Sequence, residues 1–139
     1  MLHYIHMEAE KTIFQKIIDR EVPGYILYED DFFAIFLDAF PRSPGHSLVV
    51  PKKAYRWVWD VEPYADYFRL ARALARAQQK VFGTEMIIMS VVGDEVPHAH
   101  IHVRPALEKD GSEKEFEEIA DKLRDALEET VAHEFRHQH

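Results

Sequence analysis

Residues 97–105 read PHAHIHVRP, so a histidine stands at every second position and apolar residues fill most places between them. Successive side chains of a β-strand point to opposite faces, and this period of two predicts a strand over residues 97–104. The apolar members of the strand would pack into a core: Ala99, Ile101 and Val103. The imidazoles would share the opposite face: His98, His100 and His102. The chain is therefore expected to form a sheet with an apolar core on one face and three grouped histidines on the other.

The other elements are short apolar runs and amphipathic helices, in an order that indicates an α+β fold. Thr12 with Gln15, and Ser112 with Glu115, form two capping boxes that would start the first and last helices. Short turns between consecutive strands predict a mainly antiparallel five-stranded sheet. The expected elements are a short helix from Thr12 to about Glu21, strands within 25–28, 32–38 and 46–50, a long helix over about 62–82, a strand within 86–92, and a C-terminal helix.

Length and composition limit the possible classes of protein. A chain of 139 residues with no long linker predicts one domain over 12–110, preceded by an extension at 1–11 and followed by a C-terminal helix and tail at 111–139. The absence of cysteine excludes disulfides, thiolate zinc ligands and a cysteine nucleophile, and it fits a cytoplasmic location. A net charge of −8 disfavours nucleic acid as a partner, and no apolar run is long enough to span a bilayer, so no membrane partner is expected. The start of the chain does not read as a secretory signal, and Met7 leaves open whether residues 1–6 are native.

Three interpretations of the grouped histidines remain open from the residues alone. They could be hydrogen-bonded residues without a task, although three in register make this unfavourable. They could hold a metal together with His46, although no carboxylate stands at ligand spacing. They could act in nucleophilic catalysis, in which one neutral imidazole attacks phosphorus while its neighbours hold the ring and place protons. The remaining histidines lie near the ends of the chain and are assigned no role: His3, His6, His133, His137 and His139.

Three segments together resemble the histidine triad (HIT) superfamily. HAHIHVR (98–104) is similar to the signature of the superfamily. TIFQKIIDREVP (12–23) resembles the opening helix of its Hint branch, and YEDDFFAIFLDAFPRSPGHSLVVPKK (28–53) resembles the hairpin and Pro-Gly-His strand of that branch. The resemblance implies a single HIT-like domain.

The resemblance also implies a mechanism. His100 would attack the α-phosphorus of a nucleotide and form a nucleotidyl-histidine intermediate, which water hydrolyses to a nucleoside monophosphate. His98 and His102 would orient His100 and support proton transfer, and His46 would help to order the triad. The base slot would be apolar, formed by Ile13, Phe14, Ile17, Phe36 and Leu37. Asp38 would bind the ribose hydroxyls, although it could also merely cap a loop, as Ile17 and Phe36 could be core residues.

The chain departs from the family pattern in ways that bear on substrate and metal. Thr12, Gln15 and Ala54 replace the ligands of a structural zinc found in many bacterial relatives, so no metal and no cofactor are expected. In the family, the positions of Asp94 and Glu95 are commonly occupied by glutamine and serine, which contact the phosphate and the leaving group. Two carboxylates there would repel a polyphosphate, which favours a phosphoramidate with an amine leaving group. Arg104 stands where the family signature ends in a hydrophobic residue. Its side chain would either be solvated or offset the negative charge of Asp94 and Glu95.

The sequence therefore predicts a nucleotide hydrolase acting on nucleoside 5′-phosphoramidates, including purine ones, or on related nucleotidyl compounds. The same intermediate would also serve a nucleotidyl transferase, and the acidic loop keeps open a nucleotide-binding regulator with little turnover. A zinc hydrolase is a further alternative. The resemblance implies a homodimer, for which Tyr64, Phe68 and Trp57 or Trp59 could supply apolar contact.

Overall fold

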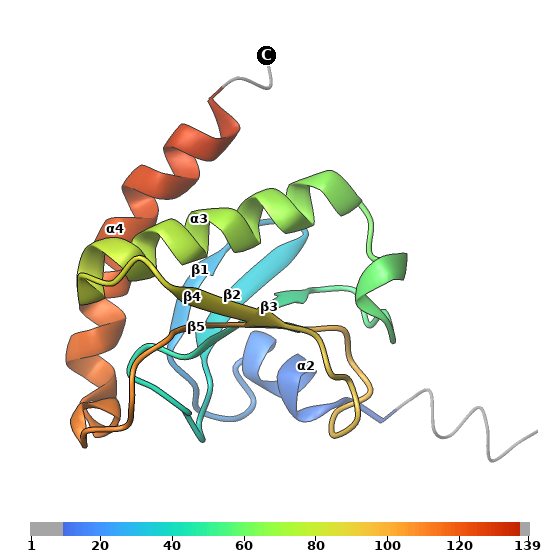
Figure 1. The fold of residues 1–139 in the computed structure, drawn as a ribbon. Coiled ribbons are helices and arrows are strands. Elements are labelled where there is room, and N and C mark those ends of the chain that lie inside the picture. Colours follow the sequence, from blue (N-terminus) through green and yellow to red (C-terminus); the bar gives the residue numbers. More distant parts are fainter. Residues whose placement is uncertain (1–9, 137–139) are drawn as a thin grey trace, which may run out of the picture.

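The computed structural model describes residues 10–136, so most of the predicted N-terminal extension and His3, His6, His137 and His139 lie outside the described residues. The predicted α+β fold with an antiparallel five-stranded sheet is confirmed (Figure 1). The strand order is β1-β2-β3-β5-β4, and every neighbouring pair is antiparallel. The strands are β1 (Ile26–Glu29), β2 (Phe33–Leu37), β3 (Ser47–Pro51), β4 (Ile87–Ser90) and β5 (Ile101–Pro105).

The helices cover the two faces of this sheet. α3 (Tyr64–Phe82) crosses one face, and α4 (Phe116–Phe135) packs against α3 and β1. α2 (Ile13–Ile18) lies against the other face (Figure 1). Single 3-10 turns, η1 (Val58–Asp60) and η2 (Ser112–Lys114), precede the two long helices.

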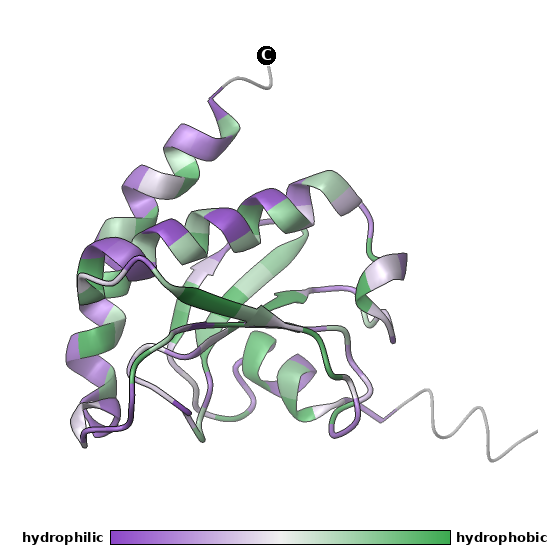
Figure 2. Ribbon diagram, viewed as in Figure 1, coloured by the Kyte–Doolittle hydropathy of each residue, from purple (hydrophilic) through white to green (hydrophobic). Residues whose placement is uncertain are grey.

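The alternation of side chains along the strands produces a hydrophobic core on each face. Phe33 and Ile35 of β2 join the core beneath α3 and α4, whereas Ala34 and Phe36 join a smaller core with α2. In Figure 2 most strand positions are hydrophobic, and α3 carries both hydrophobic and hydrophilic positions around its circumference. The smaller core under α2 is the one that adjoins the histidines.

The histidine strand begins later than predicted. β5 starts at Ile101 instead of residue 97, because the preceding backbone hydrogen-bonds outside the sheet, with the Ala99 N–H donating to the Tyr55 carbonyl at 2.7 Å. The predicted alternation is nevertheless present: Ala99, Ile101 and Val103 are buried in the larger core. The period of two therefore identified the two faces correctly but not the start of the strand.

The helix starts are only partly as predicted. Thr12 caps α2, since its hydroxyl accepts a hydrogen bond from the Gln15 N–H at 3.2 Å, but the Gln15 side chain donates to Asp19. α2 ends at Ile18, before the predicted Glu21. The second capping box is wrong: Ser112 lies in η2, and α4 begins only at Phe116, with no side-chain cap. Across residues 10–136, no helix is both long enough and apolar enough to cross a membrane.

Candidate active site

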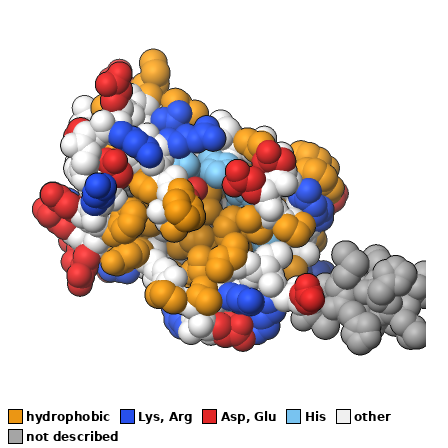
Figure 3. Space-filling model, turned by 90° about the horizontal axis from the view of Figure 1, so that it is seen from below, with side chains coloured by type: hydrophobic (Ala, Val, Ile, Leu, Met, Phe, Trp, Pro, Cys, Tyr) orange, Lys and Arg blue, Asp and Glu red, His pale blue; other side chains and the backbone are white. Residues whose placement is uncertain are grey.

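A cavity of about 390 Å³ opens beside α2 and contains most of the predicted site residues. Its apolar lining includes all five residues predicted for the base slot: Ile13, Phe14, Ile17, Phe36 and Leu37. Its polar lining consists of Asp38, Glu95, His100 and His102. Figure 3 shows histidines at the rim of an apolar hollow, with acidic side chains on one side of them and basic side chains on the other.

His98 is buried beneath this cavity and does not line it. Its Nε2 lies 2.8 Å from the carbonyl oxygen of Pro51, and because a carbonyl only accepts, Nε2 must carry the hydrogen. Its Nδ1 then accepts from the Thr12 hydroxyl at 3.2 Å. Burial lowers the pKa of His98, which keeps the ring neutral. Both nitrogens of His98 are therefore committed to holding the ring.

His100 has one committed nitrogen and lines the cavity. Its Nδ1 lies 2.7 Å from the carbonyl oxygen of His98, so the hydrogen of the neutral ring sits on Nδ1 and Nε2 keeps its lone pair. The edge-on Phe14 ring, with 4.8 Å between the ring centroids, confines the imidazole from the α2 side. In this tautomer the free lone pair of the imidazole is on Nε2.

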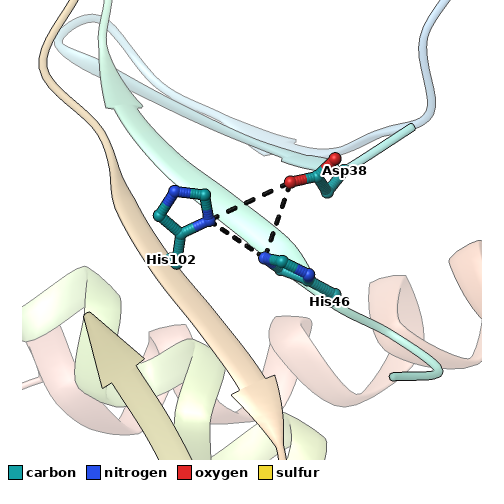
Figure 4. Close-up of side chains that lie close together, drawn as sticks. All are labelled: Asp38, His46 and His102. Atoms are coloured by element: carbon teal, nitrogen blue, oxygen red, sulfur yellow. Dashed lines mark hydrogen bonds and ion pairs between the residues drawn. The ribbon is translucent and has the colours of Figure 1, made fainter. Parts of the chain in front are cut away.

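His46, His102 and Asp38 form a second cluster next to His100 (Figure 4). The backbone N–H of Arg42 donates to Nδ1 of His46 at 3.1 Å, so the neutral His46 ring carries its hydrogen on Nε2. That Nε2 lies 3.0 Å from Nδ1 of His102 and 3.5 Å from Oδ2 of Asp38. A bond from His46 Nε2–H to His102 Nδ1 leaves His102 with its own N–H on Nε2.

Burial dominates the electrostatics of this cluster. It lowers the pKa of His46 to about 4 and also lowers the pKa of His102, while the carboxylate of Asp38 opposes both shifts. Arg42 and Arg104 lower the pKa of His46 further. Both imidazoles of the cluster are therefore neutral near pH 7. The hydrogen bond from His46 orients His102 toward the cavity without burying a further charge.

The same hydrogen bonds make this cluster a poor metal site. Ligand atoms of Asp38, His46 and His102 lie close enough together to hold an ion. Coordination through Nε2 of His46 would move its hydrogen to Nδ1, which would then face the N–H of Arg42 as two opposed donors. The ring nitrogens of His46 and His102 are therefore better suited to hydrogen bonding than to metal binding, and we continue to expect no metal here.

The two predicted acidic residues are separated by the structure. Glu95 lines the cavity, and its charge raises the pKa of His102 against the larger effect of burial. Asp94 is exposed and is not among the lining residues. Arg56 holds this loop by donating from Nη2 to the Gly93 carbonyl at 2.7 Å. Of the two carboxylates of the acidic loop, only that of Glu95 lines the cavity.

Several cavity residues were not identified from the sequence. They are Pro23, Gly24, Tyr25, Ala39, Phe40, Leu48, Val96 and Phe116. Phe116 is the first residue of α4, and no pattern in the sequence indicated that it reaches the cavity. The second role of Thr12, as the donor to His98, was also missed, because it depends on a contact 86 positions away in the chain.

Fold and site together define an α+β domain in which alternate histidines face an apolar cavity with a carboxylate at its edge. Residues 19–109 match the family model described as HIT domain, and the chain belongs to this family. An uncharacterized HIT-like protein of Methanocaldococcus jannaschii is 35% identical over 113 residues, which cover 77% of this chain and 88% of that protein. The purine nucleoside phosphoramidase of Escherichia coli K12 is 34% identical over 103 residues, which cover 68% of this chain and 87% of the enzyme. The crystal structure of a Hit-like protein involved in cell-cycle regulation from Bartonella henselae aligns with a TM-score of 0.71 and 30% identity, covering 84% of this chain and 96% of that one.

Proposed function

We propose that this protein is a nucleotide hydrolase that releases a nucleoside monophosphate from nucleoside 5′-phosphoramidates or related nucleotidyl compounds. The observation that carries the proposal is the hydrogen bond between Nδ1 of His100 and the His98 carbonyl, at 2.7 Å. In the neutral ring this bond places the hydrogen on Nδ1, so the free lone pair is on Nε2 of a ring that lines the cavity. An imidazole fixed in this tautomer can act as a nucleophile without first losing a proton.

The first chemical step forms a bond between Nε2 of His100 and the α-phosphorus. The bond to the leaving nitrogen or oxygen breaks, and its electron pair stays with the leaving group. His102 presents the N–H of Nε2 to the reacting group, where it would donate its proton to the leaving atom. Water then attacks phosphorus and returns a proton to Nε2 of His102, and the P–N bond to His100 breaks. The sum of both steps adds one water across the original P–N or P–O bond.

Glu95 supports a phosphoramidate as the preferred substrate class. Its carboxylate lies at the cavity beside His102, where it would stabilise the positive charge on a leaving nitrogen as that nitrogen is protonated, and would repel the further phosphates of a dinucleoside polyphosphate. The similarity to a purine nucleoside phosphoramidase points the same way. Faster cleavage of diadenosine tetraphosphate than of an adenosine phosphoramidate would contradict this preference.

Asp38 and the apolar slot support a nucleotide as the bound part of the substrate. Oδ1 of Asp38 accepts a hydrogen bond from the Phe40 N–H at 2.8 Å, which fixes the carboxylate at the edge of the cavity. Ribose hydroxyls would donate to it in charge-assisted bonds. Phe14 and Phe36, with ring centroids 5.5 Å apart, offer apolar surface for a base.

A homodimer and a cytoplasmic location remain predictions, as does the Hint branch within the family. The homodimer is supported by β4, which is an edge strand with several exposed apolar residues around it. They are Met86, Ile88, Met89, Val91 and Val92. Of the residues proposed from the sequence, Trp59 and Tyr64 are exposed, whereas Trp57 and Phe68 are partly buried. Sedimentation of the purified protein tests this expectation, and a monomer would contradict it.

The deciding experiment compares wild type, His100→Ala and His133→Ala with an adenosine phosphoramidate as substrate. His133 is exposed on α4 and does not line the cavity, so its variant controls for the loss of an imidazole. We expect wild type and His133→Ala to release AMP through a transient protein adduct, and His100→Ala to release none while still binding AMP. Unchanged cleavage by His100→Ala would refute the proposed nucleophile. Tight AMP binding without turnover in all three proteins would indicate a regulator.

A further inference from the structure

One side chain of α3 is both fully buried and an amide. Gln78 has none of its surface exposed, and its Nε2 donates to the carbonyl of Gly45 at 3.0 Å and to the carbonyl of Val103 at 2.9 Å. Because carbonyl oxygens only accept, the amide nitrogen must be the atom that faces them. Both hydrogens of the Gln78 amide are therefore used, each on a different segment of the chain.

The other end of this amide is not satisfied. Oε1 of Gln78 is buried and has no hydrogen-bond partner within residues 10–136. An unpaired buried acceptor lowers stability, so packing alone would be served better by an apolar side chain of the same length. The two N–H bonds are therefore what a glutamine provides at this position and an apolar residue does not.

The two carbonyls that Gln78 binds belong to neighbours of His46 and His102. Gly45 immediately precedes His46, and Val103 immediately follows His102. Val103 is buried in the core beneath α3, so the alternation of side chains places His102 on the opposite face of the sheet (Figure 1). There, Nδ1 of His102 lies 3.0 Å from Nε2 of His46. From the α3 side, Gln78 thus joins the same two segments that the histidine pair joins beside the cavity.

A second contact with α3 holds the turn at Gly45. The φ angle of Gly45 is +81°, a value that favours glycine, and a Cβ at this position would collide with the ring of Phe82, one helical turn after Gln78. The hydroxyl of Ser47 donates to the Gly45 carbonyl at 2.7 Å, so both lone pairs of that oxygen are occupied. The backbone that leads into His46 is therefore fixed against α3.

We propose that Gln78 is a positioning residue: it sets the hydrogen bond between His46 and His102 by clamping the backbone next to each of them. The inference rests on the proposed function, in which His102 donates a proton to the leaving atom. Without the two amide bonds, the turn at Gly45 is no longer tied to β5 from the α3 side, and His46 no longer holds His102 in one orientation. Since a misplacement of about 1 Å can cost about 100-fold in rate, Gln78 affects the reaction without touching the substrate.

Proton and nitrogen NMR of the histidine rings at pH 7.5 tests the clamp without requiring turnover. In wild type, signals are expected from Nε2–H of His46 and from Nε2–H of His98. Gln78→Met keeps the length of the side chain but cannot donate, so it should shift or abolish the His46 signal. The His98 signal should remain, because that ring donates to Pro51 and not to a segment held by Gln78.

Gln79→Met is the matched control. Gln79 is the next residue of α3, and its Nε2 donates to the carbonyl of Glu85 at 2.9 Å, away from the cavity. Gln79→Met should leave both histidine signals and kcat as in wild type. With an adenosine phosphoramidate, Gln78→Met should lower kcat about tenfold and change KM less than twofold, because the proposed base slot and Asp38 stay in place.

A measurement on wild type covers the case in which Gln78→Met does not fold. The side-chain amide protons of Gln78 should exchange with water more slowly than those of Gln79, since both are bonded and buried. Equal exchange of the two amides, or an unchanged His46 signal or kcat in folded Gln78→Met, would overturn the positioning role. Loss of the His46 signal in Gln78→Met, together with no phosphoramidate cleavage by wild type, would refute only the proposed reaction.

Discussion

Thr12 joins the start of α2 to the histidines through one hydroxyl group. That hydroxyl accepts from the Gln15 N–H and lies 3.2 Å from Nδ1 of His98. Since Nε2 of His98 donates to Pro51, the hydroxyl must donate to Nδ1. Replacing Thr12 with valine keeps the branched shape but removes both interactions at once. We therefore predict that Thr12→Val destabilises the protein more than the loss of a helix cap alone.

The expected loss is the sum of two contributions. Removal of a helix N-cap costs about 1 kcal/mol. A buried acceptor left without a donor costs about 1–3 kcal/mol, and His98 is buried enough for this penalty to apply. The free energy of unfolding should fall by about 2–4 kcal/mol in Thr12→Val. Thr12→Ser keeps the hydroxyl and should lose less than about 1 kcal/mol.

Urea unfolding of wild type, Thr12→Val and Thr12→Ser at pH 7.5 measures these differences. Nitrogen chemical shifts of the histidine rings provide a second readout, since loss of the donor should shift Nδ1 of His98 and leave Nε2 bonded to Pro51. If Thr12→Val and Thr12→Ser differ by less than about 0.5 kcal/mol, the hydroxyl does not bond His98 and the tautomer derived for that ring is wrong.

Two further predictions concern the cluster next to His100. Because burial lowers the folded-state pKa of His46 from 6.5 to about 4, the unfolded chain binds its proton first as the pH falls. The free energy of unfolding should therefore decrease by about 2–3 kcal/mol between about pH 6.5 and pH 4 because of His46. Urea unfolding across this range should show a weaker dependence of stability on pH for His46→Asn than for wild type. The same dependence in both proteins would contradict the lowered pKa of His46. Asp38→Ala should raise KM more than it lowers kcat, because the carboxylate is proposed to bind ribose, and steady-state kinetics with ribonucleotide and 2′,3′-dideoxy substrates test this. An equal effect of the substitution on both substrates would exclude that role.

The sequence predicted the fold because its strongest signals are local and periodic. The alternation over 98–103 separates the two faces of a strand wherever that strand begins. The apolar residues of α3 recur every three or four positions, and this period likewise identifies the buried face of a helix. The start of α4 was mispredicted because Ser112 and Glu115 have the spacing of a capping box, whereas the chain forms the 3-10 turn η2 there instead. Short polar motifs specify helix ends less strongly than apolar patterns specify faces.

The candidate site could be predicted only at the level of residue type. Four histidines and one aspartate were identified, but the hydrogen positions that distinguish their roles depend on backbone groups distant in sequence. His98 donates to the carbonyl of Pro51. The sequence pattern indicates only that a strand ends at Pro51, not that its carbonyl meets a histidine. His46 is held by a backbone N–H at the turn before it. Phe116 reaches the cavity because α4 docks on β1, a tertiary contact that no local pattern encodes.

The tautomer chain explains why three histidines alternate instead of one standing alone. A single exposed imidazole exchanges its hydrogen between both nitrogens and is protonated for part of the time near neutral pH. Here His98 is locked between Thr12 and Pro51, and its backbone carbonyl in turn fixes the hydrogen of His100. His102 receives its orientation from His46 on the neighbouring strand. Each flanking ring therefore constrains the site from a different part of the fold, and the ring between them is held in the tautomer whose Nε2 lone pair the proposed reaction uses.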